Sequence, residues 1–287
     1  MGDGRLSVSR FDFKEEKTIM AKFGFIGMGN MGYAMMKGTL QLIDKAEIVF
    51  ADVNQERVYQ VYHETGVRFM ESNAEVVNSC KYVVLAVKPQ FYETVLKNIE
   101  NIVTPETVII SIAPGKTIEY LQERLGYDKK IVRAMPNTPA LIGEGMTGIC
   151  FDEERFTAEE IQTVYAFFNS FGKVKKVDEK LMNAVVCASG SSPAYVYMMI
   201  EALADSAVKY GIPRKDAYEF AAQTVVGSAK MVLETGKHPG ELKDMVCSPA
   251  GTTIAAVEAL EEWGFRNAIM KATDACYDVC TSMAEKK

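Results

Sequence analysis

One glycine-rich segment near the N-terminus restricts the fold of this chain more than any other feature. A strand-like apolar run over residues 23–26 leads into Gly27, Gly29 and Gly32, and helix-forming residues follow over 33–42. In a strand–turn–helix unit, the first glycine allows a tight turn, the second lets a pyrophosphate approach the backbone, and the third lets the helix pack on the strand. The helix N-terminus then offers free N–H groups to phosphates. The segment predicts a dinucleotide-binding turn, although glycines also occur in ordinary turns.

A second strand-like run, residues 47–51, supports this interpretation. It ends at Asp52, twenty residues after Gly32. An acidic side chain in this place can accept hydrogen bonds from the ribose hydroxyls of a dinucleotide. The two features together favour a dinucleotide site over an ordinary α/β turn.

The order of the remaining segments predicts two domains. Strand-like and helix-like segments alternate from residue 23 to about residue 177, which predicts a doubly wound α/β domain of the Rossmann type over residues 20–178. From residue 179 to 287 the sequence shows no convincing strand, and glycine, serine and proline separate its helix-like runs, so we expect an all-helical domain. The expected strands are 23–26, 47–51, 66–69, 82–87, 107–112, 130–133, 145–151 and 173–177. The expected helices are 33–42, 55–65, 74–79, 91–99, 118–125 with Thr117 as its cap, 157–168, 180–188, 194–210, 214–234, 240–246, 252–262 and 264–284.

The composition argues against several classes of protein. The chain has 287 residues, enough for two domains of ~150 residues each, and its hydrophobic content of 48% is ordinary for a globular protein. Its net charge is −6 and it has no lysine or arginine tract, so we expect no nucleic-acid partner. No apolar segment reaches the ~18 residues that span a bilayer, so we expect no membrane partner.

The cysteines and the first residues bear on the cellular compartment. The six cysteines contain no CxxC pair, and Cys276 and Cys280 alone make a poor metal site. We therefore expect no metal, and reduced thiols in a cytoplasmic protein. Residues 1–19 are polar and lack the apolar core of a secretory signal, so we expect a disordered leader or extension before Met20.

In an open α/β sheet, ligands bind outside the carboxyl ends of the strands. Besides the glycine turn, four segments leave expected strands at this edge, at 52–54, 86–89, 111–115 and 135–139. Three of them carry a proline soon after the strand, which restricts the backbone around a flat ligand. Each segment could also be no more than a turn.

A second candidate site is the turn at residues 247–254, Cys-Ser-Pro-Ala-Gly-Thr-Thr-Ile, at the start of an expected helix. Its three hydroxyls and the N–H groups of a helix N-terminus can bind an anion such as a carboxylate. Alternatively, Ser248 or Thr252 is simply an N-cap.

The two histidines, His63 and His238, have no supporting motif, and we expect both to be structural. An alcohol dehydrogenase needs an acid/base group, which is often a histidine. A hydride acceptor without a deprotonated hydroxyl fits this chain better, and a protonated imine is such an acceptor.

Several longer motifs carry a resemblance to a known family. Residues 86–89 (Ala-Val-Lys-Pro), 133–139 (Arg-Ala-Met-Pro-Asn-Thr-Pro), 189–195 (Ser-Gly-Ser-Ser-Pro-Ala-Tyr) and 238–254 look like motifs of the pyrroline-5-carboxylate reductases. The chain resembles this family from Lys22 to about Met283. The match at 238–254 is long and ordered, and is therefore far more specific than the glycine pattern.

The resemblance implies an enzyme that reduces 1-pyrroline-5-carboxylate to L-proline with NADPH or NADH, the last step of proline biosynthesis. It also implies that helical domains for dimerisation and substrate binding interlock into homodimers, which several members assemble into decamers. The 248–253 turn would hold the substrate carboxylate, and the Thr253 hydroxyl would contact the ring nitrogen as the catalytic group. The substrate-binding residues implied are Ser248, Gly251, Thr252 and Thr253. The cofactor-binding residues are Gly27, Met28, Gly29, Asn30, Met31, Asp52, Asn73, Ala86, Val87, Lys88, Pro89, Ile112, Ala113 and Pro114.

The chain departs from the family pattern at a few positions. Ala250 and Ser192 stand where glycine is common, and a methyl at residue 250 is tolerated unless its backbone needs a positive φ. The Asp52 carboxylate would repel a 2′-phosphate and favour NADH, whereas the family often uses NADPH. Arg57, one turn into the next helix, could partly compensate for this charge.

Two other functions stay open at this point. A β-hydroxyacid dehydrogenase of the same two-domain plan needs a lysine–asparagine pair on the helix that enters the second domain. Lys180 and Asn183 mimic this pair, but the glycine pattern expected before it is missing. A non-catalytic NAD(P)-binding sensor would bind cofactor without turnover, and it gives no reason for the 248–253 turn to match a substrate loop.

Overall fold

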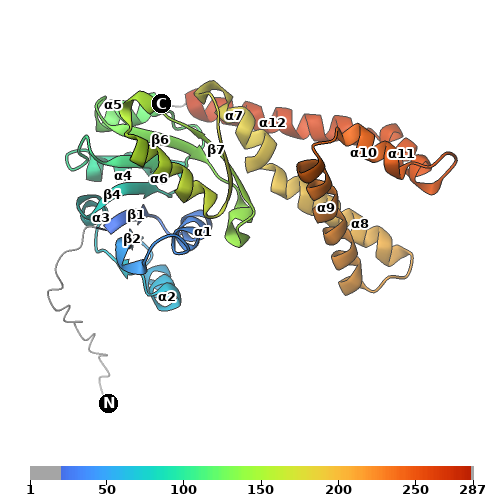
Figure 1. Ribbon diagram of the computed structural model, residues 1–287, viewed down its shortest axis with the longest axis horizontal. Coiled ribbons are helices and arrows are strands. Elements are labelled where there is room, and N and C mark those ends of the chain that lie inside the picture. The colour runs from blue at the N-terminus through green and yellow to red at the C-terminus, as the bar shows by residue number, and fades with distance from the viewer. Residues whose placement is uncertain (1–20, 286–287) are drawn as a thin grey trace, which may run out of the picture.

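The structure, a computed structural model, describes residues 21–285, so the leader expected over residues 1–19 lies outside the described part of the chain. Figure 1 shows a layered α/β unit at one end and a long arm of helices at the other. The last strand of the α/β unit ends at Lys176, and only helices follow within the described residues, as expected.

Eight strands form one sheet in the order β3-β2-β1-β4-β5-β6-β7-β8. Neighbouring strands are parallel except β6 and β7, which are antiparallel. The β6–β7 connection contains only a short 3-10 helix (Thr138–Ile142), too short for the crossover that parallel neighbours require, so the alternation of strand and helix is interrupted here. The strands are β1 (Ala21–Ile26), β2 (Ile48–Ala51), β3 (Arg68–Phe69), β4 (Cys80–Leu85), β5 (Val108–Ser111), β6 (Lys130–Met135), β7 (Gly145–Cys150) and β8 (Gly172–Lys176).

Helices cover both faces of the sheet because its central strands carry apolar side chains on both sides. On one face, Phe23 of β1 stacks on Phe167 of α6 with 4.9 Å between ring centroids. On the other face, Leu85 of β4 and Ile109 of β5 belong to the same core as Leu96 of α4. The helices of this unit are α1 (Asn30–Thr39), α2 (Gln55–Thr65), α3 (Asn73–Ser79), α4 (Tyr92–Ile99), α5 (Ile118–Leu125) and α6 (Ala158–Asn169).

Side-chain caps explain where several of these helices begin. The Asn54 side chain accepts a hydrogen bond from the Arg57 backbone N–H at the start of α2, and Thr117 accepts one from Tyr120 at the start of α5. Helix α2 has the expected bounds. Helix α1 begins at Asn30, three residues before the expected start, because Gly32 lies inside its first turn rather than before it.

The arm consists of consecutive helices. α8 and α9 form a hairpin around Ala204, Ala217 and Ala221, whose small side chains allow close packing. α12 then runs back along the arm to the α/β unit, where Cys280 packs in the same cluster as Met182 (Figure 1). After a 3-10 turn (Glu179–Leu181) come α7 (Met182–Val185), a π-helical turn (Val186–Gly190), α8 (Ser192–Lys209), α9 (Arg214–Thr235), α10 (Pro239–Val246), α11 (Thr252–Glu262) and α12 (Phe265–Glu285).

The 133–139 motif joins the arm to the sheet. The buried Arg133 guanidinium donates to the Glu179 carboxylate at 3.0 Å, and this carboxylate also accepts from the Ile118 backbone N–H at 2.8 Å. The Asn137 amide donates to the Ser189 carbonyl at 3.0 Å and accepts from the Met146 N–H at 2.8 Å. These contacts explain why polar side chains are buried where the two parts meet.

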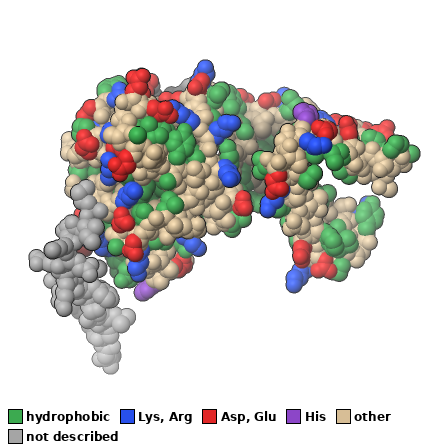
Figure 2. Space-filling view, in the orientation of Figure 1, with side chains coloured by type: hydrophobic (Ala, Val, Ile, Leu, Met, Phe, Trp, Pro, Cys, Tyr) green, Lys and Arg blue, Asp and Glu red, His purple; other side chains and the backbone are tan. Residues whose placement is uncertain are grey.

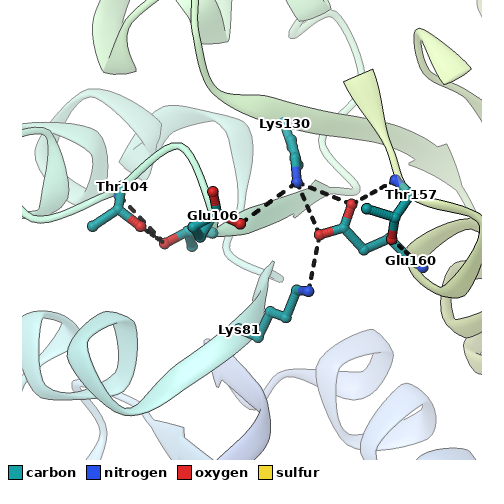
Figure 3. A network of polar contacts seen from close by, with 7 residues as sticks. Lys81, Thr104, Glu106, Lys130, Thr157 and Glu160 are labelled. Carbon is teal, nitrogen blue, oxygen red and sulfur yellow. Dashed lines mark hydrogen bonds and ion pairs between the residues drawn. The ribbon is translucent and has the colours of Figure 1, made fainter. Parts of the chain in front are cut away.

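A buried carboxylate organises the amino ends of β4 and β6, at the edge of the sheet away from the glycine turn. Glu160 of α6 is 1% exposed and accepts from Lys130 Nζ at 2.9 Å and 3.0 Å, from Lys81 Nζ at 2.9 Å and from the Thr157 N–H at 2.9 Å (Figure 3). Burial raises the pKa of Glu160, but the Thr157 N–H and the two ammonium groups outweigh it and hold this pKa at about 2.

We expect this carboxylate to make the fold sensitive to acid. Its folded-state pKa of about 2 lies below its ordinary value of 4.5, so its ionised form stabilises the fold above about pH 4.5, and this contribution disappears as the pH falls toward 2. Glu160→Gln should lower the free energy of unfolding by about 3 kcal/mol at pH 7. Below pH 4.5 it should lose less stability on further acidification than the wild-type protein, as measured by urea unfolding.

The neighbouring Glu159 is exposed and provides a matched control. Glu159→Gln should change the free energy of unfolding by less than about 0.5 kcal/mol at either pH. If Glu160→Gln and the wild-type protein lost stability in parallel between pH 5 and pH 3, the lowered pKa would not contribute to folding.

Candidate active site

The structure places the three glycines of the turn in three different environments. Gly27 follows β1 with φ +98°, and a Cβ there would lie 2.8 Å from Val87 Cγ1. Gly32 lies in the first turn of α1, and a Cβ there would lie 2.2 Å from the Gly27 carbonyl oxygen. Gly29 is the N-cap of α1, and no described atom lies within 4 Å of the position of its Cβ. The turn therefore needs glycine for backbone shape at residue 27 and for close packing at residue 32, whereas residue 29 leaves open space.

Asp52 reaches this turn from the end of β2. Its Oδ2 accepts from the Met28 N–H at 2.6 Å and its Oδ1 accepts from the Asn54 N–H at 2.8 Å. A carboxylate oxygen has two lone pairs, so each oxygen can accept a further hydrogen bond. The Arg57 Nε–H donates to the Met28 carbonyl at 2.7 Å, and its guanidinium lies 4.7 Å from the centre of the Tyr33 ring. A carboxylate and a guanidinium thus flank the same turn.

The segments after β4 and β5 leave the same edge of the sheet. Leu85, the last residue of β4, pairs with Ile26 of β1 on one side and with Ser111 of β5 on the other. The expected cofactor-binding residues of these segments therefore start at the level of the glycine turn; they are Ala86, Val87, Lys88, Pro89, Ile112, Ala113 and Pro114. Asn73, the remaining member of the expected set, is the first residue of α3, after its cap Ser72.

The 247–254 turn connects α10 to α11. Gly251 is the N-cap of α11, and within the described residues no side chain caps this helix end. The alternative interpretation of Ser248 or Thr252 as a side-chain N-cap is therefore wrong. Because α1 likewise begins without a side-chain cap in the described part of the chain, the first-turn N–H groups of both helices can bind an anion.

The backbone angle at Ala250 decides whether a methyl is tolerated at this position. Its φ is +56°, and among the described residues it is the one non-glycine residue with positive φ. An L-residue in this conformation is strained by about 1–2 kcal/mol. The turn therefore has a backbone shape that glycine would adopt more easily, and the methyl is held there under strain.

Within one chain, this turn does not face the carboxyl edge of the sheet. Figure 1 shows α10 and α11 at the end of the arm that lies away from the α/β unit. The residues expected to bind cofactor and those expected to bind substrate thus lie on separate parts of the molecule, a separation that the sequence did not reveal.

The arm exposes many large apolar side chains. Leu233 is 81% exposed and Trp263 is 85% exposed, and Figure 2 shows hydrophobic side chains along the surface of the arm. Exposed apolar surface of this extent marks an interaction surface.

Neither histidine lies in a setting suited to acid/base catalysis. The Nδ1 of His238 accepts from the Gly240 N–H at 3.0 Å and caps α10, whereas His63 is exposed on α2 with its ring against Tyr62. The Lys180 side chain is 79% exposed and lies 3.5 Å from Asp178. The lysine of the pair that would suit a hydroxyacid dehydrogenase is therefore a surface residue.

The described residues contain no group of three or more His, Cys, Asp or Glu side chains placed to hold a metal ion. Across residues 21–285, no helix combines the length and apolar character needed to cross a membrane. All six cysteines are free.

Comparison with known proteins covers nearly the whole chain. Residues 179–283 match the family model for pyrroline-5-carboxylate reductase dimerisation, and residues 22–115 match that for NADP oxidoreductase, coenzyme F420-dependent. The chain is 46% identical over 262 residues to the pyrroline-5-carboxylate reductase of Escherichia coli, covering 90% of this chain and 96% of the relative. It is 44% identical over 253 residues to that of Methanosarcina acetivorans, covering 88% and 93%.

Solved structures show the same likeness. The crystal structure of Plasmodium falciparum pyrroline carboxylate reductase with NADP bound matches with a TM-score of 0.84 and 34% identity, covering 92% of this chain and 98% of that one. The structure of a pyrroline-5-carboxylate reductase from Coxiella burnetii matches with a TM-score of 0.84 and 30% identity, covering 93% and 99%.

Proposed function

The chain belongs to the pyrroline-5-carboxylate reductase family, and on this premise we propose where its active site lies and how two copies build it. It is an NAD(P)H-dependent oxidoreductase that reduces 1-pyrroline-5-carboxylate to L-proline in proline biosynthesis, and it works as a homo-oligomer. The remote position of the 248–253 turn is the observation that carries the proposal for the site.

The carboxyl edge of the sheet is the proposed cofactor site. The N–H groups at the start of α1 would bind the pyrophosphate, for which Gly29 leaves room. The Asp52 carboxylate would accept from the adenosine ribose, and residues 86–89 and 112–114 would enclose the nicotinamide half. Bound NAD(P)H supplies the hydride.

The turn before α11 is the proposed substrate site. The N–H groups of its first turn and the Ser248 and Thr252 hydroxyls would hold the substrate carboxylate. Thr253, in the first turn of α11, would accept the N–H of the protonated imine through its hydroxyl oxygen. These neutral groups orient the ring without a titrating base, so the rate enhancement comes from positioning and electrostatic stabilisation.

We assign the two halves of each active site to different copies of the chain. In one copy the substrate turn lies away from its own cofactor edge, and the arm exposes apolar side chains such as Leu233 and Trp263. A second copy that packs on this arm can present its turn to the cofactor edge of the first. We further propose that the enzyme works in the cytoplasm, where its six free cysteines stay reduced.

A mixing experiment tests the shared site. Gly29→Ala should disable the cofactor half and Thr253→Ala the substrate half, so each homodimer is nearly inactive. A heterodimer of the two contains one site with both halves intact. Co-expression in equal amounts should therefore restore about a quarter of the wild-type activity with 1-pyrroline-5-carboxylate. Activity no higher than that of either parent would place both halves of the site in one chain.

Asp52→Ser should shift the cofactor preference toward NADPH. Removing the carboxylate removes its repulsion of a 2′-phosphate, while Arg57 stays beside the turn. We expect the ratio of kcat/KM for NADPH to that for NADH to rise by roughly tenfold, equivalent to ~1.4 kcal/mol. Steady-state kinetics with both cofactors measures this ratio.

Asp44 provides a control for this change, because it is another aspartate whose side chain accepts from a backbone N–H two residues on, but it precedes β2 rather than following it. Asp44→Ser should leave the cofactor ratio unchanged. An unchanged ratio in Asp52→Ser would show that Asp52 does not face the ribose.

A further inference from the structure

The hydroxyl of Tyr92 lies between the ends of two strands. Tyr92 is the first residue of α4 and its side chain is fully buried, at 0% exposure. Its Oη lies 2.9 Å from the Leu85 carbonyl oxygen and 3.0 Å from Ser111 Oγ. Leu85 ends β4, Ser111 ends β5, and the two residues are paired in the sheet. The hydroxyl therefore bridges the points where the segments 86–89 and 112–114 leave the sheet.

The direction of these hydrogen bonds follows from the number of hydrogens. A phenol has one hydrogen, and only this hydrogen can bond the Leu85 carbonyl, so Ser111 Oγ–H donates to Tyr92 Oη. Burial raises the pKa of Tyr92, although Ser111 and the backbone N–H groups of Ile112 and Ala113 lower it in part. The phenol therefore stays neutral at working pH, and the bridge keeps its direction.

A second buried tyrosine, Tyr82, provides a comparison. Tyr82 is 2% exposed and lies on β4 nearer its amino end, where its ring stacks on Phe23. A phenylalanine would fill either space equally well. Of these two hydroxyls, it is that of Tyr92 that bonds backbone at the carboxyl edge, where the proposed cofactor site lies.

We propose that Tyr92 is a positioning residue for hydride transfer, whose hydroxyl holds the segments 86–89 and 112–114 at the spacing that the nicotinamide half of the cofactor requires. This inference rests on the cofactor site proposed above. Hydride transfer needs the reacting atoms about 3–3.5 Å apart in a defined orientation, so loosening either segment lowers the productive fraction of complexes. Without the phenol, the buried Leu85 carbonyl and Ser111 hydroxyl lose their shared partner.

Tyr92→Phe tests this role, with two readouts that do not depend on each other. The Kd for NADH and NADPH, followed by the fluorescence of the reduced nicotinamide, should rise by about tenfold, and kcat should fall by about tenfold. The KM for 1-pyrroline-5-carboxylate should stay within about twofold, because the groups proposed to hold the substrate carboxylate belong to the 248–253 turn of the second copy and not to the segments that Tyr92 holds. Ser111→Ala should cause the same changes in Kd and kcat. The double variant should show no larger changes than either single variant, because all three variants remove the same bridge.

Tyr82→Phe is the matched control, and should leave both Kd and kcat unchanged even where it lowers the Tm as much as Tyr92→Phe does. If neither Tyr92→Phe nor Ser111→Ala changed Kd or kcat beyond this control, Tyr92 would be a core residue only and the proposal would be wrong. The Kd measurement needs no turnover. If the protein bound NAD(P)H in a Tyr92-dependent way but did not reduce 1-pyrroline-5-carboxylate, this result would contradict the proposed function. The role proposed for Tyr92 would still stand.

Discussion

Thr253→Ala is expected to lower kcat for 1-pyrroline-5-carboxylate by about a hundredfold while the Kd for NAD(P)H stays nearly unchanged. Thr253 lies in the first turn of α11, where the N–H groups carry no side-chain cap within the described chain and the side chain is partly exposed. Its hydroxyl oxygen is the group proposed to accept the imine N–H. An alanine leaves the substrate carboxylate bound at the helix N-terminus but lets the ring rotate away from the hydride.

Matched variants separate this role from a general disturbance of the helix. Thr253→Ser keeps the hydroxyl and should retain most of kcat, whereas Thr253→Val keeps the shape without the hydroxyl and should behave like Thr253→Ala. Thr224→Ala removes a hydroxyl that donates to the Phe220 carbonyl of its own helix, α9, and should leave kcat unchanged. Unaltered kinetics in Thr253→Ala and Thr253→Val would remove Thr253 from the mechanism.

Alanine substitutions at Gly29 and Gly32 are expected to inactivate the enzyme for different reasons. At Gly29 the methyl meets no described atom within 4 Å, and the φ of −64° suits any residue. Gly29→Ala should therefore keep the wild-type Tm but raise the Kd for NAD(P)H by about a hundredfold, because the methyl occupies the approach of the pyrophosphate.

Gly32→Ala should instead damage the fold. The new Cβ would lie 2.2 Å from the Gly27 carbonyl oxygen and 3.1 Å from the Ala86 Cβ, so α1 must move away from the turn. We expect a loss of about 3 kcal/mol in the free energy of unfolding. The higher helix propensity of alanine, about 1 kcal/mol, does not offset this loss. Thermal unfolding and cofactor titration of both variants, side by side, measure the difference. Equal Tm values for the two variants would contradict this separation of roles.

The local sequence predicted the elements well where capping residues mark their ends. α2 has the expected bounds, with Asn54 capping it and Gly66 ending it at φ +68°. α11 also has the expected bounds, although no side chain caps its start in the described part of the chain. The start of α1 was misjudged because glycine is a poor helix former, so the helix was expected only after Gly32. The close approach of α1 to the Gly27 carbonyl requires glycine inside the helix, and this is a tertiary constraint.

Other residues gave no signal in the sequence. In the sequence, Tyr92 looks like any other large side chain on the buried face of a helix. None of its neighbours in the sequence indicates that its hydroxyl reaches β5. The positive φ of Ala250 is also invisible in the sequence, because alanine ordinarily avoids that conformation. Arg133 and Glu179 are 46 residues apart, and their ion pair depends on how the arm leaves the sheet.

The chemistry proposed for each half of the site was predicted from the sequence alone. Glycines 27, 29 and 32 with Asp52 predict a dinucleotide turn, and the hydroxyls of the 248–253 turn predict an anion site, because short spacings set the local backbone and the groups it presents. Only the tertiary structure decided that these halves lie on different parts of one molecule. Local backbone preferences do not act over the two hundred or so residues between Gly29 and Thr253. The packing of α8 to α12 into a projecting arm sets that separation, and so makes a second copy of the chain part of the proposed active site.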